Sequence, residues 1–379
     1  MSCSPLRALQ VSAYAPPHLG GIEICAAQLF DTLTALGCEV TWIASDVPRV
    51  GAQGRRIRIP VRNQIEDWFG VPIPIPTLSA VRKIWRAVED CDLVHVHDVL
   101  YLNSILAVCF ARLRGRPIIV TLHRWPLAYR NRWVTLLQNA AHHSLGRLCL
   151  SSANAVTCIH VEVLRKAEAF TKVRCQLIPN GIARDFSVKN TEITPELQHS
   201  LRGHLKLPLD RKVAVFAGRF VENKGLHDIR AIAASFPGVL FVMCGSGPLN
   251  PSDWGLANVS VRGLMSSTDL REFFLASDFL LLPSTEAGFP LVVPEAMACG
   301  LPCCILRQTW FAFGRAEDYF VLLERDRLVN GIAEYLDSPF SFCKRRALAS
   351  YAKENWDWDK SSAEYLSVYT QVFSRERER

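Results

Sequence analysis

Two series of short apolar runs, each run followed by a segment of helical periodicity, constrain the fold of this 379-residue chain most strongly. The first series consists of residues 6–13, 40–44, 93–97 and 118–122. The second series consists of residues 213–218, 239–244, 259–262, 279–282 and 302–306. Strands that alternate with helices favour parallel, doubly wound sheets, and a chain of this length is too long for one ordinary core. The sequence therefore predicts an α/β protein with two Rossmann-like domains that face each other across a cleft, joined by the polar stretch 184–211.

Charge is distributed unevenly between the two halves of the chain. Residues 1–180 contain 20 Lys and Arg against 12 Asp and Glu, whereas the rest of the chain contains 23 against 24. The formal net charge of +7 therefore belongs to the first half. Such basicity can steer a protein to an anionic membrane surface or to a phosphorylated acceptor, and a merely solvated basic face is the alternative.

The sequence also indicates a compartment. It contains no membrane span of about 20 uninterrupted apolar residues. The first residues have neither the long apolar region nor the cleavage site of a signal peptide, and residues 6–13 suit a first strand. The 13 cysteines lie mostly within apolar runs and form no CxxC pair, so we expect reduced core thiols rather than disulfides or a zinc site. Together these features predict a cytoplasmic protein.

The segment SDFLLLPSTEAGFPLVVPEAMACGLP, residues 277–302, is typical of a strand, a tight loop and a helix. Its apolar residues 279–282 suit a strand that is buried on both faces. Pro283 ends the strand, Gly288 marks the loop, Pro294 suits the first position of the helix, and Gly300 suits its C-terminal cap. The loop should therefore lie at the carboxyl end of a parallel strand, beside a helix N-terminus whose free N–H groups attract anions.

Two basic residues and one acidic residue lie near the carboxyl ends of predicted strands. The segment VAVFAGRFVENKGLHDI, residues 213–229, predicts another strand and turn, with a helix that begins near Gly225. Arg219 and Lys224 then lie at the carboxyl end of the strand, where fixed cations and a helix dipole can hold a diphosphate and stabilise growing negative charge. Glu295, in the first turn of the helix that follows Pro290, can accept hydrogen bonds from sugar hydroxyls.

These motifs resemble those of the retaining glycosyltransferases of family 4, which have the GT-B fold. The donor loop of that family reads roughly P-S-x-x-E-G-F-G, with a second Glu eight positions after the first, and a GR…KG pair clamps the donor phosphates. Alignment on Pro283, Gly288 and Glu295 places Ala287 where the family has its first Glu, and Glu286 one residue earlier. Either Glu286 takes over through a shift of the loop, as we expect, or the site dispenses with that carboxylate.

The resemblance covers nearly the whole chain and implies three parts: residues 1–185 on the acceptor side, residues 186–355 on the donor side, and a C-terminal helix, 356–379, that crosses back to the first domain. It implies transfer of a sugar from a nucleotide diphosphate sugar to a glycan or lipid-linked acceptor in bacterial-type polysaccharide or glycoconjugate synthesis. It implies no metal or other cofactor. The alternatives are a nucleotide-sugar epimerase of the same architecture and a degenerate sugar-nucleotide binding module, which Ala287 suggests.

The resemblance also implies the residues of the site. The catalytic set is Arg219, Lys224, Glu286 and His123. The donor-binding set is Gly20, Gly21, Gly218, Gly263, Leu264, Gly288, Phe289, Pro290, Leu291 and Glu295. His123 follows an apolar run and matches a family His that touches the donor sugar, whereas Gly263 and Leu264 match the segment that frames the nucleotide base. Gly20 and Gly21 allow the backbone to approach a ligand closely.

A polar pattern precedes Asp98 in the first half. His95 and His97 alternate with valines, so both imidazoles lie on one face of the predicted strand. The pattern suggests either a metal site or a polar strand end that shapes the acceptor side, and we expect the second because no third ligand is identified.

The segment 124–147 mixes aromatic and basic residues. Its aromatic residues are Trp125, Tyr129 and Trp133, and the arginines among them are Arg124, Arg130 and Arg132. Such a mixture is typical of a helix in a membrane interface, and a core-packed helix with a solvated basic edge is the alternative. Nucleic acid is not expected as a partner, because no binding motif accompanies the charge.

Overall fold

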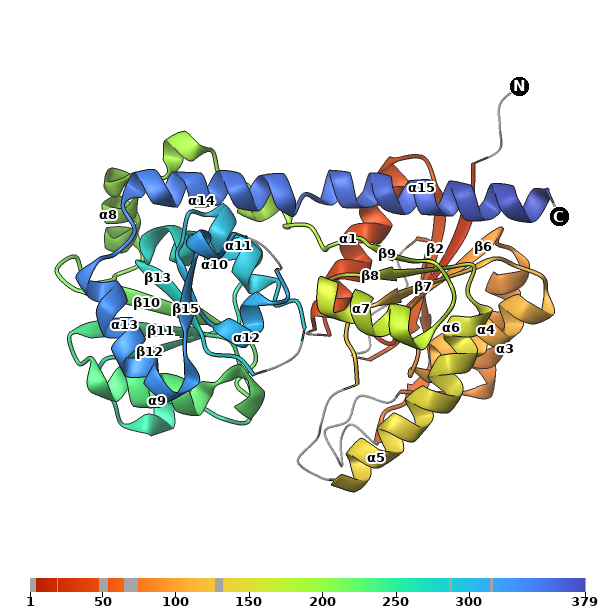
Figure 1. Cartoon of the computed structure of the whole chain (residues 1–379), viewed down its shortest axis with the longest axis horizontal. Coiled ribbons are helices and arrows are strands. Elements are labelled where there is room, and N and C mark those ends of the chain that lie inside the picture. Colours follow the sequence, from red (N-terminus) through yellow and green to blue (C-terminus); the bar gives the residue numbers. More distant parts are fainter. Residues whose placement is uncertain are drawn as a thin grey trace. The chain divides into compact units, whose positions relative to one another are not determined.

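The structure is a computed structural model that describes residues 5–18, 20–47, 54–64, 74–126, 132–285, 288–313 and 316–378. The chain forms two compact units (Figure 1). Unit 1 consists of residues 1–180 and 358–379, and unit 2 consists of residues 181–357. The sequence places the corresponding boundaries after residues 185 and 355.

Unit 1 is built on a seven-stranded parallel sheet with the order β3-β2-β1-β6-β7-β8-β9. Its strands are β1 (Arg7–Val11), β2 (Glu39–Ser45), β3 (Arg56–Ile59), β6 (Leu93–His97), β7 (Ile118–Leu122), β8 (Ala155–Cys158) and β9 (Cys175–Leu177). A small antiparallel pair is formed by β4 (Val61–Arg62) and β5 (Ile75–Pro76). The helices are α1 (Gly21–Ala35), α3 (Leu78–Glu89), α4 (Leu102–Leu113), α5 (Arg132–Ala141), α6 (Arg147–Ser152), α7 (Val161–Phe170) and α15 (Trp358–Arg377), with a π turn, η1 (His142–Gly146), between α5 and α6.

The two faces of this sheet differ in chemistry. Alternate residues of each strand point to opposite faces. One set, which includes Val94 and Val96 of β6, packs with helices α3, α4, α6 and α7 in one apolar core. The other set contains apolar residues such as Leu93 and Ile119 but also buried polar ones, which are, with Ser12 just after β1, Gln10, His95, His97, Thr121 and Thr157. Both faces of a parallel sheet are normally apolar, so a buried polar face needs hydrogen-bond partners.

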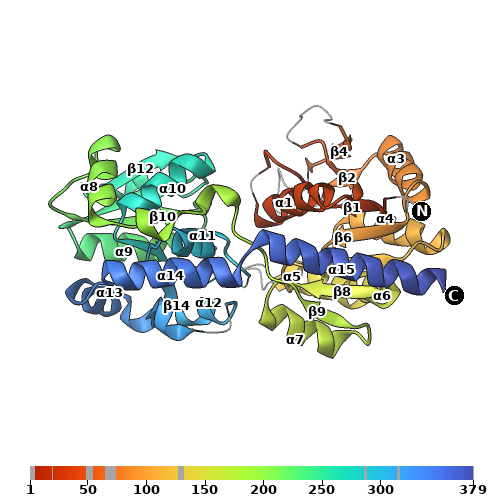
Figure 2. The ribbon, with the colours of Figure 1, turned by 90° about the horizontal axis from the view of Figure 1, so that it is seen from above.

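Helix α15 supplies several of these partners. Tyr369 contacts His95, with 2.7 Å between the phenol oxygen and Nδ1, and the phenol oxygen of Tyr365 lies 3.3 Å from Oγ1 of Thr121. Ser362 of α15 donates to Oγ1 of Thr32 in α1 over 2.7 Å, and the two helices lie side by side (Figure 2). The end of the chain is therefore an integral layer of unit 1.

Unit 2 contains a six-stranded parallel sheet with the order β12-β11-β10-β13-β14-β15. Its strands are β10 (Lys212–Ala217), β11 (Val239–Cys244), β12 (Val259–Gly263), β13 (Phe279–Leu282), β14 (Cys303–Leu306) and β15 (Phe320–Leu323). The helices are α8 (Pro195–His204), α9 (Leu226–Ser235), α10 (Ser267–Ala276), α11 (Val292–Ala298), α12 (Arg307–Trp310), α13 (Leu328–Asp337) and α14 (Phe342–Asn355). Short 3-10 turns are η2 (Arg184–Phe186), η3 (Asn190–Glu192), η4 (Glu222–Lys224), η5 (Pro251–Trp254), η6 (Glu317–Tyr319) and η7 (Arg325–Arg327).

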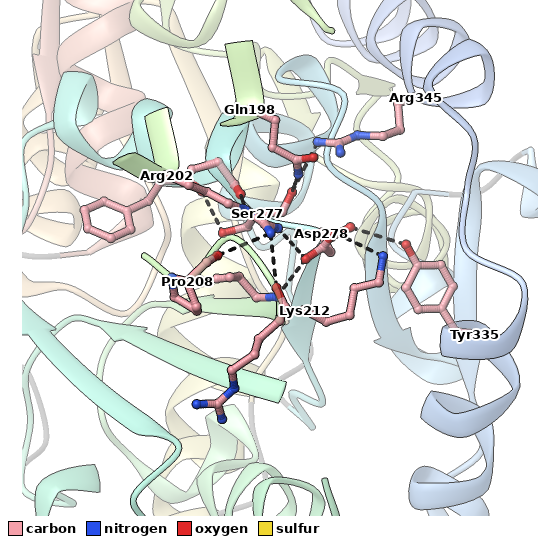
Figure 3. Close-up of polar contacts among 12 residues, drawn as sticks. Gln198, Arg202, Pro208, Lys212, Ser277, Asp278, Tyr335 and Arg345 are labelled. Carbon is pink, nitrogen blue, oxygen red and sulfur yellow. Dashed lines mark hydrogen bonds and ion pairs between the residues drawn. The ribbon is translucent and has the colours of Figure 1, made fainter. Parts of the chain in front are cut away.

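A buried polar network joins the elements at the amino ends of β10 and β13 (Figure 3). One carboxylate oxygen of Asp278 accepts from the guanidinium of Arg202 over 2.6 Å and from the backbone N–H of Val213 over 2.7 Å. Arg345, from α14, donates to the carbonyls of Gly300 and Ser277. Buried charges are tolerated when they are paired and hydrogen-bonded in this way. The network therefore fixes the edge of the sheet opposite to the strand carboxyl ends.

Every strand that the sequence predicts is present, but β3, β4, β5, β8, β9 and β15 were not expected, and two other expectations need correction. The polar stretch 184–211 is not a simple connector, because it contains α8 and the buried Arg202 and belongs to unit 2. Pro294 was expected at the first position of its helix, but α11 begins at Val292. Proline fits there as well, because the first N–H groups of a helix have no partner within the helix.

Two further expectations concern thiols and membranes. Every cysteine in the described part of the chain is free, and most of them are buried. Burial raises the pKa of Cys91, Cys149 and Cys244 to about 12, which keeps these thiols protonated and unreactive. Within the described ranges, no helix is long and apolar enough to cross a membrane.

Candidate active site

The carboxyl edge of the unit 2 sheet gathers the site residues that the second half of the sequence predicts. Strands β12, β11, β10 and β13 are neighbours in the sheet. Strand β12 ends in Gly263 and is followed by Leu264. The loops after β11, β10 and β13 carry the turn 245–248, residues 218–224, and the described residues 283–285 and 288–291, respectively. Because all these strands are parallel, their loops share one edge.

Glycines allow these loops to approach one another closely. Gly218 donates its N–H to the carbonyl of Cys244 over 3.0 Å, and Phe220 donates to the carbonyl of Ser246 over 2.8 Å. A Cβ added to Gly245 would lie 1.9 Å from the carbonyl oxygen of Gly218. A side chain at Gly245 would therefore separate the loop of Arg219 from its neighbour.

The loop that carries Lys224 is joined to the donor loop in the same way. Ser284 and Thr285 donate to the carbonyl of Asn223, through Oγ over 3.0 Å and through the backbone N–H over 2.9 Å. Gly225 has φ +77°, and a Cβ there would lie 2.2 Å from the carbonyl oxygen of Pro283. Helix α9 begins immediately afterwards, at Leu226.

Arg219 and Lys224 differ in their environment. The side chain of Arg219 is exposed at the edge of the sheet, whereas Lys224 is partly buried. Both follow β10, and Lys224 lies one residue before the N-cap of α9, where the helix dipole favours an anion. The edge of unit 2 thus combines two cations with a helix N-terminus.

The donor loop places its residues in different ways. Phe289 is only 9% exposed and packs against Phe313 and Trp356, with ring centroids 4.9 and 6.1 Å away. Its side chain therefore anchors the loop, and only its backbone can face a ligand. Gly288, Pro290 and Leu291 lie partly exposed beside it, directly before α11. The expected roles of Glu286 and Ala287 concern positions outside the described residues.

Glu295 lies in the first turn of α11, where its N–H donates to the carbonyl of Leu291 over 3.1 Å. Its side chain is half-buried, and burial raises the pKa of its carboxyl group to about 7. Desolvation disfavours the charged form of an acid. Glu295 therefore titrates near neutral pH.

Strand β12 ends in residues that were expected to frame a base. Gly263 has φ +71°, and its carbonyl accepts from the N–H of Gly245 over 2.7 Å. The next side chain, Leu264, is 60% exposed, which makes it available to the flat face of an aromatic ligand.

In unit 1, the loop after β1 is closed by contacts around Gly20. A Cβ on Gly20 would lie 2.1 Å from a carboxylate oxygen of Glu23. The buried Glu23 pairs with His18 over 3.2 Å, and the ring of His18 stacks on Tyr14 with centroids 3.9 Å apart. Glu23 was not predicted from the sequence, although a carboxylate in the first turn of a helix after Gly20 and Gly21 is a usable signal.

Asp98 and His123 meet at the carboxyl ends of β6 and β7. The backbone N–H of His123 donates to one oxygen of Asp98 over 2.8 Å, and Nε2 of His123 lies 2.8 Å from Nδ1 of His97. Asp98 has φ +60°, and its second oxygen is buried without a hydrogen-bond partner among the described residues. Burial raises its pKa to about 6, and the charge of Arg124 opposes that rise. Strained residues and orphaned oxygens of this kind concentrate at functional sites.

The imidazole of His95 is held by neighbouring hydroxyl groups. Both ring nitrogens of His95 are engaged, by Tyr369 and by Thr121. Among the residues that the structure describes, no group of three or more His, Cys, Asp or Glu side chains is arranged to hold a metal ion.

Two family models match the chain. The one described as Glycosyltransferase Family 4 matches residues 19–186, and the one described as Glycosyl transferases group 1 matches residues 198–355. The chain belongs to the group 1 glycosyltransferases of the family 4 type. The two matches divide near the boundary between unit 1 and unit 2.

Individual proteins resemble the chain over different lengths. A teichuronic acid biosynthesis glycosyltransferase from Bacillus subtilis, TuaC, is 27% identical over 263 residues, which are 64% of this chain and 64% of that protein. Sucrose-phosphate synthase from Thermosynechococcus elongatus superposes with a TM-score of 0.73 at 19% identity, over 98% of this chain and 100% of that one. HepE from Anabaena in complex with UDP superposes with a TM-score of 0.73 at 16% identity, over 97% and 100%. The likenesses to solved structures establish the GT-B fold.

The close contact between Gly225 and Pro283 yields a prediction. Gly225→Ala should lower the free energy of unfolding by more than about 2 kcal/mol, because a left-handed conformation and a clash with backbone both oppose a Cβ. Chemical denaturation measures the change. At Gly238 an added Cβ meets nothing within 4 Å. Gly238→Ala is therefore the control and should leave stability unchanged, and equal losses in both variants would contradict the prediction.

Proposed function

We propose that the chain transfers a sugar, with retention of its anomeric configuration, from a nucleotide diphosphate sugar to a hydroxyl of a glycan or lipid-linked acceptor. The observation that carries the proposal is the union of the Arg219, Lys224 and Glu295 loops at one edge of the unit 2 sheet. This union gives a diphosphate two cations and a helix N-terminus, and gives a ribose a carboxylate. TuaC, named for teichuronic acid biosynthesis, supports a role in bacterial-type polysaccharide synthesis.

In the proposed mechanism, Arg219 and Lys224 stabilise the negative charge that grows on the diphosphate as the bond to the sugar breaks. The acceptor hydroxyl attacks from the face that the diphosphate leaves, and a donor phosphate oxygen takes its proton. Glu295 holds ribose hydroxyls, backbone groups of residues 288–291 hold sugar hydroxyls and phosphate, and Leu264 lies against the base. The cations of the protein supply the charge, so no metal or other cofactor is required.

Unit 1 supplies the acceptor side in this proposal. His123 contacts the donor sugar, and the backbone at Gly20 and Gly21 approaches the ligand. The second oxygen of Asp98 can accept a hydrogen bond from an acceptor hydroxyl, which suits an uncharged polyol surface. The base and the sugar of the donor are chosen by screening, and UDP-sugars come first because HepE holds UDP.

The reaction is tested by following free nucleoside diphosphate. Release only when acceptor is added supports transfer, whereas an epimerase converts the donor without acceptor and a binding module releases nothing. Arg219→Ala and Lys224→Ala should each lower turnover at saturating substrate by about 100-fold or more, since each removes a charged contact to the leaving group. Arg230→Ala, which removes an exposed cation from α9, is the control. A clamp variant that keeps more than about a tenth of wild-type turnover would sink the proposed clamp.

Glu295 predicts how donor binding depends on pH. The carboxylate form is the acceptor for ribose hydroxyls, and burial raises the pKa of this carboxyl group to about 7. Donor affinity should therefore rise by about tenfold between pH 6 and pH 8, as the ionised fraction grows. Glu295→Gln should bind the donor more weakly and lose this pH dependence. Titration calorimetry with a nucleotide sugar, whose diphosphate stays ionised over this range, measures both effects. An unchanged affinity in the variant would show that Glu295 only stabilises the start of α11 and does not bind the donor.

We also propose that unit 1 binds the anionic inner face of a cell membrane as a peripheral, cytoplasmic protein. Helix α5, turn η1 and helix α6 form one continuous helical stretch. Its exposed leucines are Leu136, Leu137, Leu145 and Leu148, and Leu137 is 73% exposed. Exposed Arg132 and Arg147 accompany them. Exposed leucines with nearby arginines are the chemistry of an interfacial helix.

Arg124 differs from the other arginines of this segment. It is half-buried and donates to the phenol oxygen of Tyr101, so it belongs to the site rather than to the membrane-facing surface. Arg130 lies outside the described residues.

Vesicle sedimentation tests membrane binding. The protein should sediment with anionic vesicles but not with neutral ones and should be released by salt, because each basic residue near an anionic bilayer contributes about 1 kcal/mol within a Debye length. The double variant Arg132→Gln and Arg147→Gln should bind more weakly. The control, Lys172→Gln and Arg174→Gln, removes the same charge elsewhere on unit 1. No sedimentation with anionic vesicles at low salt would show that the acceptor is reached in solution.

A further inference from the structure

The polar face of the unit 1 sheet contains a row of three histidines, His95, His97 and His123. The proposed mechanism gives a role to His123 alone. His95 and His97 lie on the same face of β6, with ring centroids 4.6 Å apart, and His97 contacts His123 after β7. All three side chains are buried. Burial lowers the pKa of each imidazole below its usual value, to about 3 for His97, so the rings are neutral.

His95 is fixed on both ring nitrogens. Nδ1 lies 2.7 Å from the phenol oxygen of Tyr369, and Nε2 lies 2.6 Å from Oγ1 of Thr121. Thr121 is itself 2.6 Å from the hydroxyl of Thr157. Contacts with α15 and β7, supported by β8, therefore fix the orientation of the His95 ring.

His97 rests against the fixed ring of His95 and makes one side-chain hydrogen bond, to His123. The two nitrogens, Nδ1 of His97 and Nε2 of His123, are 2.8 Å apart. Nε2 of His97 is buried and has no partner among the described residues. The side chain of His97 is 1% exposed, which excludes direct contact with a ligand.

Neutrality couples the two rings. A neutral imidazole carries one N–H, so one ring of the pair donates and the other accepts. A buried N–H without a partner is rarer in proteins than a buried acceptor without one. The unpartnered Nε2 of His97 is therefore the bare nitrogen, and its Nδ1–H donates to Nε2 of His123. The proton of His123 then resides on Nδ1.

We propose that His97 is a positioning residue that holds His123 in the Nδ1–H tautomer and directs this N–H toward the sugar. The inference rests on the proposed contact between His123 and the donor sugar, and it adds the direction of that hydrogen bond. His123 becomes a donor to a sugar oxygen rather than a base. Tyr369 and His95 act behind it by fixing the ring on which His97 packs.

Two substitutions of His97 separate its nitrogens. The amide of Asn is as many bonds from Cβ as Nδ1 is, whereas the amide of Gln is as far as Nε2. His97→Asn should therefore keep the hydrogen bond to His123, and His97→Gln should lose it. The ¹⁵N chemical shifts of His123, measured by NMR on the full ligand-free protein labelled at histidine, report which nitrogen carries the proton.

We expect the Nδ1–H tautomer of His123 in the wild-type protein and in His97→Asn, and a loss of that tautomer in His97→Gln. Turnover should follow, with His97→Gln reduced by about tenfold or more, because a small misplacement of a contact group lowers the rate strongly. An Nε2–H tautomer in the wild type, or the same tautomer in both variants, would overturn the inference. If His123→Ala keeps full turnover while the tautomers behave as expected, the sugar contact fails and the positioning by His97 stands.

Discussion

Parallel strand pairing is the constraint from which the arrangement of this protein follows. Every pair within the two large sheets is parallel, so each strand must be followed by a segment that returns across the sheet. The carboxyl ends of neighbouring strands then share an edge. Asn223 and Thr285 are far apart in the chain, yet they are joined by a backbone hydrogen bond of 2.9 Å. The parallel topology therefore brings the loop of Arg219 and Lys224 next to the loop after β13, although the two loops are far apart in the sequence.

Glycines and one buried side chain determine how closely the loops at that edge approach one another. Gly245 lets two loop backbones meet, and Gly225 lets η4 reach the end of β13. The side chain of Phe289, in contrast, is buried in the core of unit 2. Burial of this ring anchors the chain at Phe289 and leaves the backbone groups beside it available to a ligand. At the opposite edge of the sheet, the hydrogen bond between Asp278 and the N–H of Val213 joins the amino ends of β10 and β13.

The strands that the sequence predicted are all present, but six others and the contacts between strands were not predicted. Residues 93–97, 118–122, 239–244 and 279–282 are strands with the expected bounds, because continuous apolar runs between turn residues leave few alternatives. The expected position of Arg219, just after β10 at the carboxyl edge of the sheet, is observed for the same reason. The burial of Phe289 and the His97–His123 pair were missed because they depend on contacts between segments distant in the chain. Glu23 was missed although its position in the first turn of α1 is a local signal. The placement of Pro294 failed for a local reason, because proline is tolerated in more than one position of a first helical turn.

The two units differ in their electrostatics in a way that suits two different substrates. The edge of unit 2 carries Arg219 and Lys224 beside a helix N-terminus, which suits the permanent charge of a diphosphate. The corresponding edge of unit 1 carries neutral imidazoles, because burial lowers their pKa, and a carboxyl oxygen of Asp98 that lacks a donor among the described residues. A neutral N–H and an oxygen acceptor recognise hydroxyl groups without competing for the diphosphate. In the proposed transfer, the cations of unit 2 hold the leaving group, whereas hydrogen bonds to residues of unit 1 orient the sugar and the acceptor.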